Sequence, residues 1–103
     1  MKKSKIVVAR SSAELAHVLG LSPEDAIEME IRRELNDKII QVVKRQGLTH
    51  LQVANAAKTS RTRVTAIMNR NTHEISTDLM LRILVALGYT ARITFSKTNA
   101  LSR

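Results

Sequence analysis

The stretch that decides the fold is LTHLQVANAAKTSRTRVTAIMNRN, residues 48–71. It predicts two short helices, each opening at a side-chain hydroxyl that can cap free backbone amides: one over 49–57 with Thr49 as N-cap, and one from about 61 to 69 with Ser60 as N-cap. A link of two residues separates them. Two helices joined this closely predict a helix-turn-helix.

The second of these helices has an apolar side and a polar side. Val64 and Ile67 are spaced to face a core, which leaves other residues of the helix outside. Its outer face and its N-terminal amide donors suit the major groove of DNA. Arginine can bind guanine with a bidentate fork, threonine can bond to a base edge, and methyl groups can touch thymine. The predicted base contacts are Arg61, Thr62, Thr65 and Ala66.

Polar side chains that flank this helix are better placed for phosphates, which fix register rather than sequence. The predicted phosphate contacts are His50, Ser60, Arg63, Asn69, Arg70 and Asn71. Two of them have an alternative interpretation. Arg63 could pair with a nearby acid, and His50 could be simply an exposed residue of a first helical turn.

The charge distribution agrees with a polyanionic partner. The net charge is +8, yet seven of the nine acids precede residue 38. From Lys38 to His73 there are seven Lys and Arg residues and no Asp or Glu. Such a block favours binding of nucleic acid. A solvated basic surface that maintains solubility is the alternative.

The rest of the chain predicts one all-α domain over residues 11–96, after an N-terminal arm at 1–10. Only 2% of the residues are aromatic, so the core must be aliphatic, which suits packed helices. A brief helix is expected over 11–20. A long helix follows from Ser22 to about Arg45. Its predicted apolar stripe consists of Ile27, Ile31, Leu35, Ile39 and Val42.

A last helix begins at Ser76 and is closed by Gly88, which makes a bundle of about five helices. After it, apolar and polar residues alternate over 89–96, as in a β-strand. The apolar positions of this strand are Tyr89, Ala91, Ile93 and Phe95. A strand needs a partner, which could be residues 5–8 or the same strand of a second chain. We favour the second chain, and we expect residues 97–103 to be a flexible tail.

Other classes of function have little support. The three histidines are far apart, there are no cysteines, and no metal-ligand spacing or phosphate-binding loop occurs, so no catalytic residue, metal or cofactor is predicted. Few aromatic residues are available to stack unpaired RNA bases, which favours duplex DNA. No segment approaches the length of apolar residues that spans a membrane, and we expect a cytoplasmic protein.

The helix-turn-helix stretch resembles the lambda repressor-like, or Xre, family of transcriptional regulators. The flanking segments, residues 22–47 and 76–97, resemble a subgroup that contains HigA-type antitoxins. Two residues depart from the family pattern. His50 stands where glutamine is usual, and Lys58 stands where the turn usually has glycine. Either Lys58 adopts a left-handed conformation at some energetic cost, or the first helix ends differently.

Together these observations predict a homodimeric DNA-binding regulator, acting as a repressor at a palindromic operator. Two recognition helices would then lie about 34 Å apart on the duplex. The alternative is an antitoxin that neutralises a cognate toxin protein through the acidic early helices and binds DNA to regulate its own expression.

Overall fold

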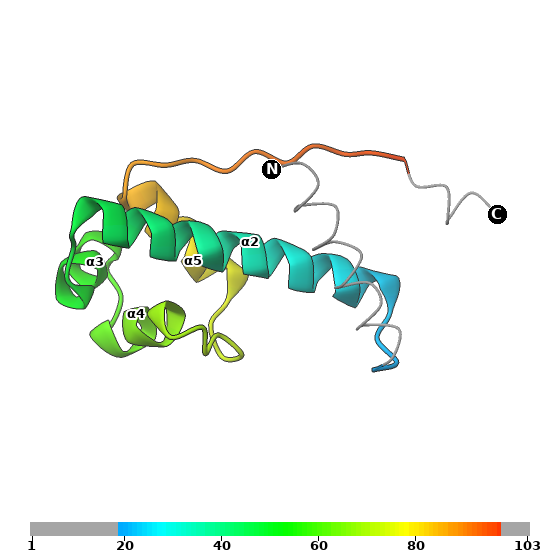
Figure 1. The fold of residues 1–103 in the computed structure, drawn as a ribbon, viewed down its shortest axis with the longest axis horizontal. Helices are drawn as coiled ribbons and strands as arrows, with labels where there is room; N and C mark the ends of the chain where they lie inside the picture. Colours follow the sequence, from blue (N-terminus) through cyan, green and yellow to red (C-terminus); the bar gives the residue numbers. More distant parts are fainter. Residues whose placement is uncertain (1–18, 98–103) are drawn as a thin grey trace.

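The computed structural model describes residues 19–97, which form four helices around an aliphatic core (Figure 1). The helices are α2 (Pro23–Gln46), α3 (His50–Ala57), α4 (Arg61–Met68) and α5 (Thr77–Ala86). The long α2 forms one side of the molecule, α4 and α5 pack against it, and α3 packs against α4 and α5. The four helices agree with the all-α class predicted from the sequence. In the described part of the chain, no helix is long and apolar enough to cross a membrane.

Every helix begins at the predicted cap. The hydroxyl of each N-cap accepts a hydrogen bond from the backbone amide three residues later, at distances of 3.0 to 3.2 Å. The four N-caps are Ser22, Thr49, Ser60 and Ser76. At α2 and α3 the third helical residue also accepts from the amide of the cap, which completes a capping box. These local bonds define where the helices start.

The core consists of aliphatic side chains from all four helices. Its largest fully buried residues are Ile39, Val42, Val43, Val53, Val64, Ile67, Met80 and Ile83. The prediction that the core is built without aromatic residues is therefore confirmed within the described chain; Tyr89 packs only against its edge.

The apolar stripe predicted for α2 is correct only in its C-terminal half. Leu35, Ile39 and Val42 are buried, but Ile27 and Ile31 are 56% and 43% exposed. The reason is length. A helix of 24 residues is about 36 Å long, whereas α4 and α5, with 8 and 10 residues, are about 12 to 15 Å long. The first turns of α2 extend past the helices that could cover them (Figure 1).

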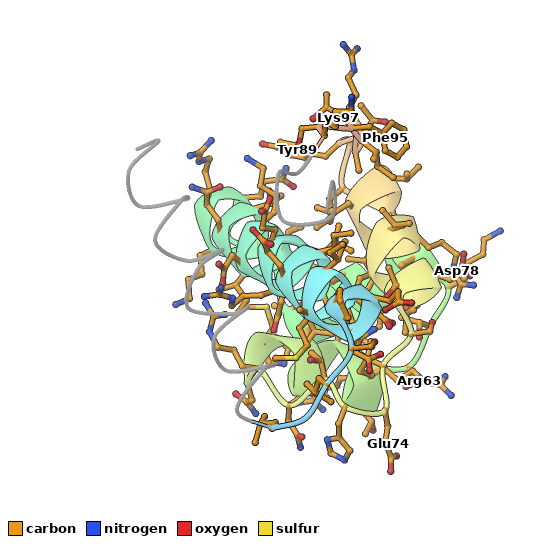
Figure 2. All side chains as sticks on the ribbon, turned by 90° about the vertical axis from the view of Figure 1, so that its right-hand side faces the viewer. Arg63, Glu74, Asp78, Tyr89, Phe95 and Lys97 are labelled. Carbon is orange, nitrogen blue, oxygen red and sulfur yellow. The ribbon has the colours of Figure 1, made fainter. Side chains whose placement is uncertain are left out.

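The segment after α5 is extended but forms no β-ladder with any described residue. It leaves the bundle at Gly88, whose φ of +91° is the predicted helix stop, and runs on the side of α2 away from α4 (Figures 1 and 2). The predicted strand over 89–96 is thus absent from the single chain. A strand requires a partner for its backbone groups, and no other described segment supplies one. The predicted helix over 11–20, the arm 1–10 and the tail beyond residue 97 lie essentially outside the described residues.

Candidate nucleic-acid interface

The turn between α3 and α4 is tight and left-handed. Lys58 has φ 58° and ψ 51°, so of the two alternatives at this position the left-handed conformation is the one adopted. The turn is closed by two backbone bonds: the amide of Thr59 donates to the carbonyl of Ala54 at 2.9 Å, and that of Lys58 donates to Asn55 at 3.4 Å. Ala54 is buried, and its small side chain lets the two helices cross closely.

A side chain from α5 supports the same turn. The guanidinium of Arg82 donates from Nε to the carbonyl oxygen of Ala57 at 3.3 Å and from Nη2 to that of Lys58 at 3.4 Å. These carbonyls belong to the C-terminal end of α3, where the helix has no internal donors left. Arg82 therefore links the helix-turn-helix to the last helix of the core. Nothing in its local sequence indicates this role.

The first turn of α4 is the most accessible part of the predicted recognition helix. Arg61, Thr62 and Arg63 are exposed, while Val64 is buried as predicted. Arg63 points away from the core, on the side of the molecule opposite to Tyr89 and Phe95 (Figure 2). This turn contains no acid. The positive end of the helix dipole and the charges of two arginines therefore add up there without an opposing charge in the turn. This arrangement suits an anion or the electronegative edge of guanine.

Two predicted base contacts lie deeper. Thr65 and Ala66 are both half-buried, and Ala66 packs against the edge of the core. The hydroxyl of Thr65 is hydrogen-bonded to Nδ1 of His50, at 2.8 Å. A side chain predicted to contact a base and one predicted to contact a phosphate are thus joined to each other. The structure brings α3 and α4 together through this bond.

The loop after α4 carries the remaining predicted phosphate contacts. Asn69 and Asn71 are exposed, and the amide of Asn71 donates to the carbonyl of Ala66 at 2.8 Å. Arg70 has a positive φ of 61°, and its guanidinium pairs with the carboxylate of Asp37 on α2 at 2.5 Å. Both side chains of this pair are 55% exposed, so the arginine remains accessible to solvent.

Two polar residues of α2 hold this loop and the end of α4, and sequence reasoning missed both. Arg32 donates to the carbonyls of Thr72 and Ile75 and to the hydroxyl of Thr77. Its side chain therefore faces the loop. Buried Asn36, one turn further along, donates from Nδ2 to the carbonyl of Ile67 at 2.9 Å. The available signal was a pair of polar residues four apart beside the apolar stripe.

The described residues offer no cluster for a metal. Within residues 19–97, no three His, Asp or Glu side chains gather in a way that could hold an ion.

The helix-turn-helix lies entirely inside the acid-free segment from Lys38 to His73. Asp37, directly before that segment, pairs with Arg70 inside it.

Comparisons with known proteins agree with this geometry. Residues 18–96 match a family model described as a helix-turn-helix domain, and the match covers most of the chain, including all four described helices. No curated protein and no solved structure gave a match.

Proposed function

Because the chain belongs to this helix-turn-helix domain family, we propose that it is a sequence-specific DNA-binding transcriptional regulator that inserts α4 into the major groove. It binds as a homodimer to a palindromic operator and acts as a repressor. The lambda repressor-like resemblance of the same residues supports this function.

The observation that carries the proposal is the exposed first turn of α4. Arg61 and Thr62 extend from a helix N-terminus that is held across α3 by a closed turn and lies in a region without acids. Arginine at such a position can donate two hydrogen bonds to O6 and N7 of guanine. Thr62 can bond to the neighbouring base edge, and Thr65 and Ala66 border the same surface.

Phosphate contacts would fix the register of α4 on the duplex. On the α3 side they come from His50, and at the start of α4 from Ser60 and Arg63. In the loop they come from Asn69, Arg70 and Asn71, which are all exposed.

The proposed dimer forms through the extended C-terminal segment. Tyr89 is held at its start by the core and by Lys38, whose Nζ lies 5.1 Å from the ring centroid. Beyond it Ala91 is exposed, and Ile93 and Phe95 are 71% and 93% exposed. Pairing this segment with its copy would satisfy its backbone groups and cover these apolar side chains. Since the segment lies away from α4, such pairing leaves the recognition helix uncovered (Figure 1).

A second candidate function is that of an antitoxin, favoured by the first turns of α2. There the exposed Ile27 and Ile31 lie among acids such as Glu24 and Glu28, a surface opposite in charge to the helix-turn-helix. Such a surface suits a basic toxin protein. The test is whether the product of an adjacent gene copurifies with the wild-type chain and not with the Ile31→Glu variant.

Fluorescence anisotropy tests the main proposal, with duplexes from the protein's own promoter region and random duplexes of equal length. Arg61→Ala should weaken promoter binding by about 1 to 3 kcal/mol and relax the preference at one base pair. Arg45→Ala is the matched control, because it removes the same charge from an exposed position at the end of α2, outside both the helix-turn-helix and the proposed dimer segment. Equal losses in both variants, or equal affinity of the wild type for promoter and random DNA, would refute sequence-specific binding through α4.

A further inference from the structure

The hydrogen bond between His50 and Thr65 joins two residues of different helices at the edge of the proposed DNA surface. Nδ1 of the imidazole lies 2.8 Å from Oγ1 of the threonine, and both residues are half-buried. His50 is the first residue of α3, and Thr65 lies in the middle of α4. The bond uses one ring nitrogen and leaves the other, Nε2, for a different partner.

The chemistry of the ring determines which atom of this bond is the donor. A neutral imidazole has one nitrogen that donates and one that accepts. A phosphate oxygen only accepts, so a phosphate at Nε2 requires the proton on Nε2. Nδ1 is then an acceptor, and the hydroxyl of Thr65 must donate to it. With its single proton used in this way, the hydroxyl offers only lone pairs to any further group.

We propose that His50 and Thr65 read one base pair together, with the phosphate-bound ring of His50 making Thr65 an obligate acceptor. In the major groove the donors are the amino groups of adenine N6 and cytosine N4, whereas guanine and thymine present acceptors. The pair therefore selects adenine or cytosine at the position that faces Thr65. His50 is a positioning residue in this reading, and Thr65 makes the contact. The inference rests on the proposed DNA binding through α4.

The alternative is that the bond has a purely structural role and only fixes the packing of α3 on α4. The two roles differ in what they predict for specificity. A packing bond affects stability and the affinity for all duplexes alike. If His50 and Thr65 read a base pair together, the bond instead affects the base preference at one position of each half-site. Only a measurement of that base preference distinguishes the two roles.

The experiment uses the full chain and a duplex library with a randomised core, selected at about pH 8. The duplex recovered with the wild type and its single-base variants are then titrated by anisotropy. For the wild type, we expect one position at which adenine or cytosine is preferred over guanine or thymine by about tenfold. Thr65→Val, which keeps the volume and removes the hydroxyl, should reduce this preference to about twofold or less, and Thr65→Ser should retain it.

The histidine variants test the coupling. His50→Phe removes the acceptor, so the hydroxyl of Thr65 can donate or accept and the preference should relax. His50→Gln should retain it, because an amide can accept from Thr65 through oxygen and donate to phosphate through nitrogen. Asn55→Ala is the control on α3, since Asn55 is an exposed polar residue of the same helix as His50 and is none of the proposed DNA contacts. It should leave this position unchanged.

Each outcome decides the inference. If Thr65→Val removes the preference and His50→Phe does not, Thr65 reads the base without help from the ring, and the proposal is wrong. If neither variant changes any position although the wild type binds selectively, the bond only fixes packing; the inference then fails while the proposed function stands. If the wild type selects no sequence at all, both fail. Should His50→Phe not fold by circular dichroism, His50→Leu takes its place, because leucine also removes the acceptor.

Discussion

Lys58→Gly should stabilise the fold, although it removes a side chain and a charge. The left-handed conformation of Lys58 costs an L-residue about 1 to 2 kcal/mol, because its Cβ lies too close to the following carbonyl oxygen. Glycine has no Cβ and avoids this cost, but it loses more backbone freedom on folding, which offsets about 0.5 to 1 kcal/mol. The Lys58 side chain is exposed, and no described contact depends on its ammonium group. The expected net gain in the free energy of unfolding is about 0.5 to 1 kcal/mol.

The assay is equilibrium urea denaturation followed by circular dichroism, with the midpoint and the slope fitted for each variant. The midpoint should rise while the slope stays constant, which identifies a change of stability rather than of the surface exposed on unfolding. Lys58→Ala is the control: it removes the charge and keeps the Cβ, so its midpoint should stay close to that of the wild type. If the alanine variant gains as much stability as the glycine variant, relief of charge repulsion is the cause and the backbone argument is refuted.

Three further predictions concern the contacts around the helix-turn-helix. Asp37→Asn removes the carboxylate that pairs with Arg70, so affinity for duplex DNA at low salt should rise by a factor of about 1.5 to 5. The affinity is measured by anisotropy, and no change would mean that this pair does not compete with phosphate. Asn36→Ala removes one donor from the Ile67 carbonyl, which keeps the amide of Arg70, so the free energy of unfolding should fall by about 0.5 to 1.5 kcal/mol in urea denaturation. A loss close to zero would mean that solvent replaces the bond. Truncation after Gly88 removes the exposed extended segment and should convert the dimer to monomer in sedimentation equilibrium; a dimer of unchanged stability would show that the seam lies elsewhere.

Much of the local structure was predictable because it depends on neighbours in the sequence. The four N-caps bond to amides three residues away, and Gly47 and Gly88 end their helices with positive φ. Even the unusual conformation of Lys58 follows from a short link between two helices whose turn usually contains glycine. These features are decided within a few residues, where local bonding and backbone sterics dominate.

Tertiary contacts determined the burial along α2 and the partners of the long polar side chains, which the sequence pattern does not reveal. The same apolar period runs through all of α2, yet Ile27 is exposed and Ile39 is fully buried, because the described helices α4 and α5 pack on the C-terminal half. Arg32 bonds to residues that lie 40 to 45 positions later in the chain, and Arg82 to residues 24 and 25 positions earlier. No local pattern distinguishes such an arginine from one on a solvated face.

In the candidate site, too, the sequence determined some features and the fold determined others. The composition of the stretch 48–71 by itself determined an acid-free helix-turn-helix with arginine at the start of its second helix, and these residues lie where expected. Their roles at bases and phosphates stay predictions. Only the fold decided that Thr65 is bonded to His50 and Arg70 to Asp37, since each bond joins residues from separate elements. Capping and turn geometry are determined by bonds between near neighbours, whereas the partner of a long polar side chain depends on which distant backbone the packed core brings within its reach.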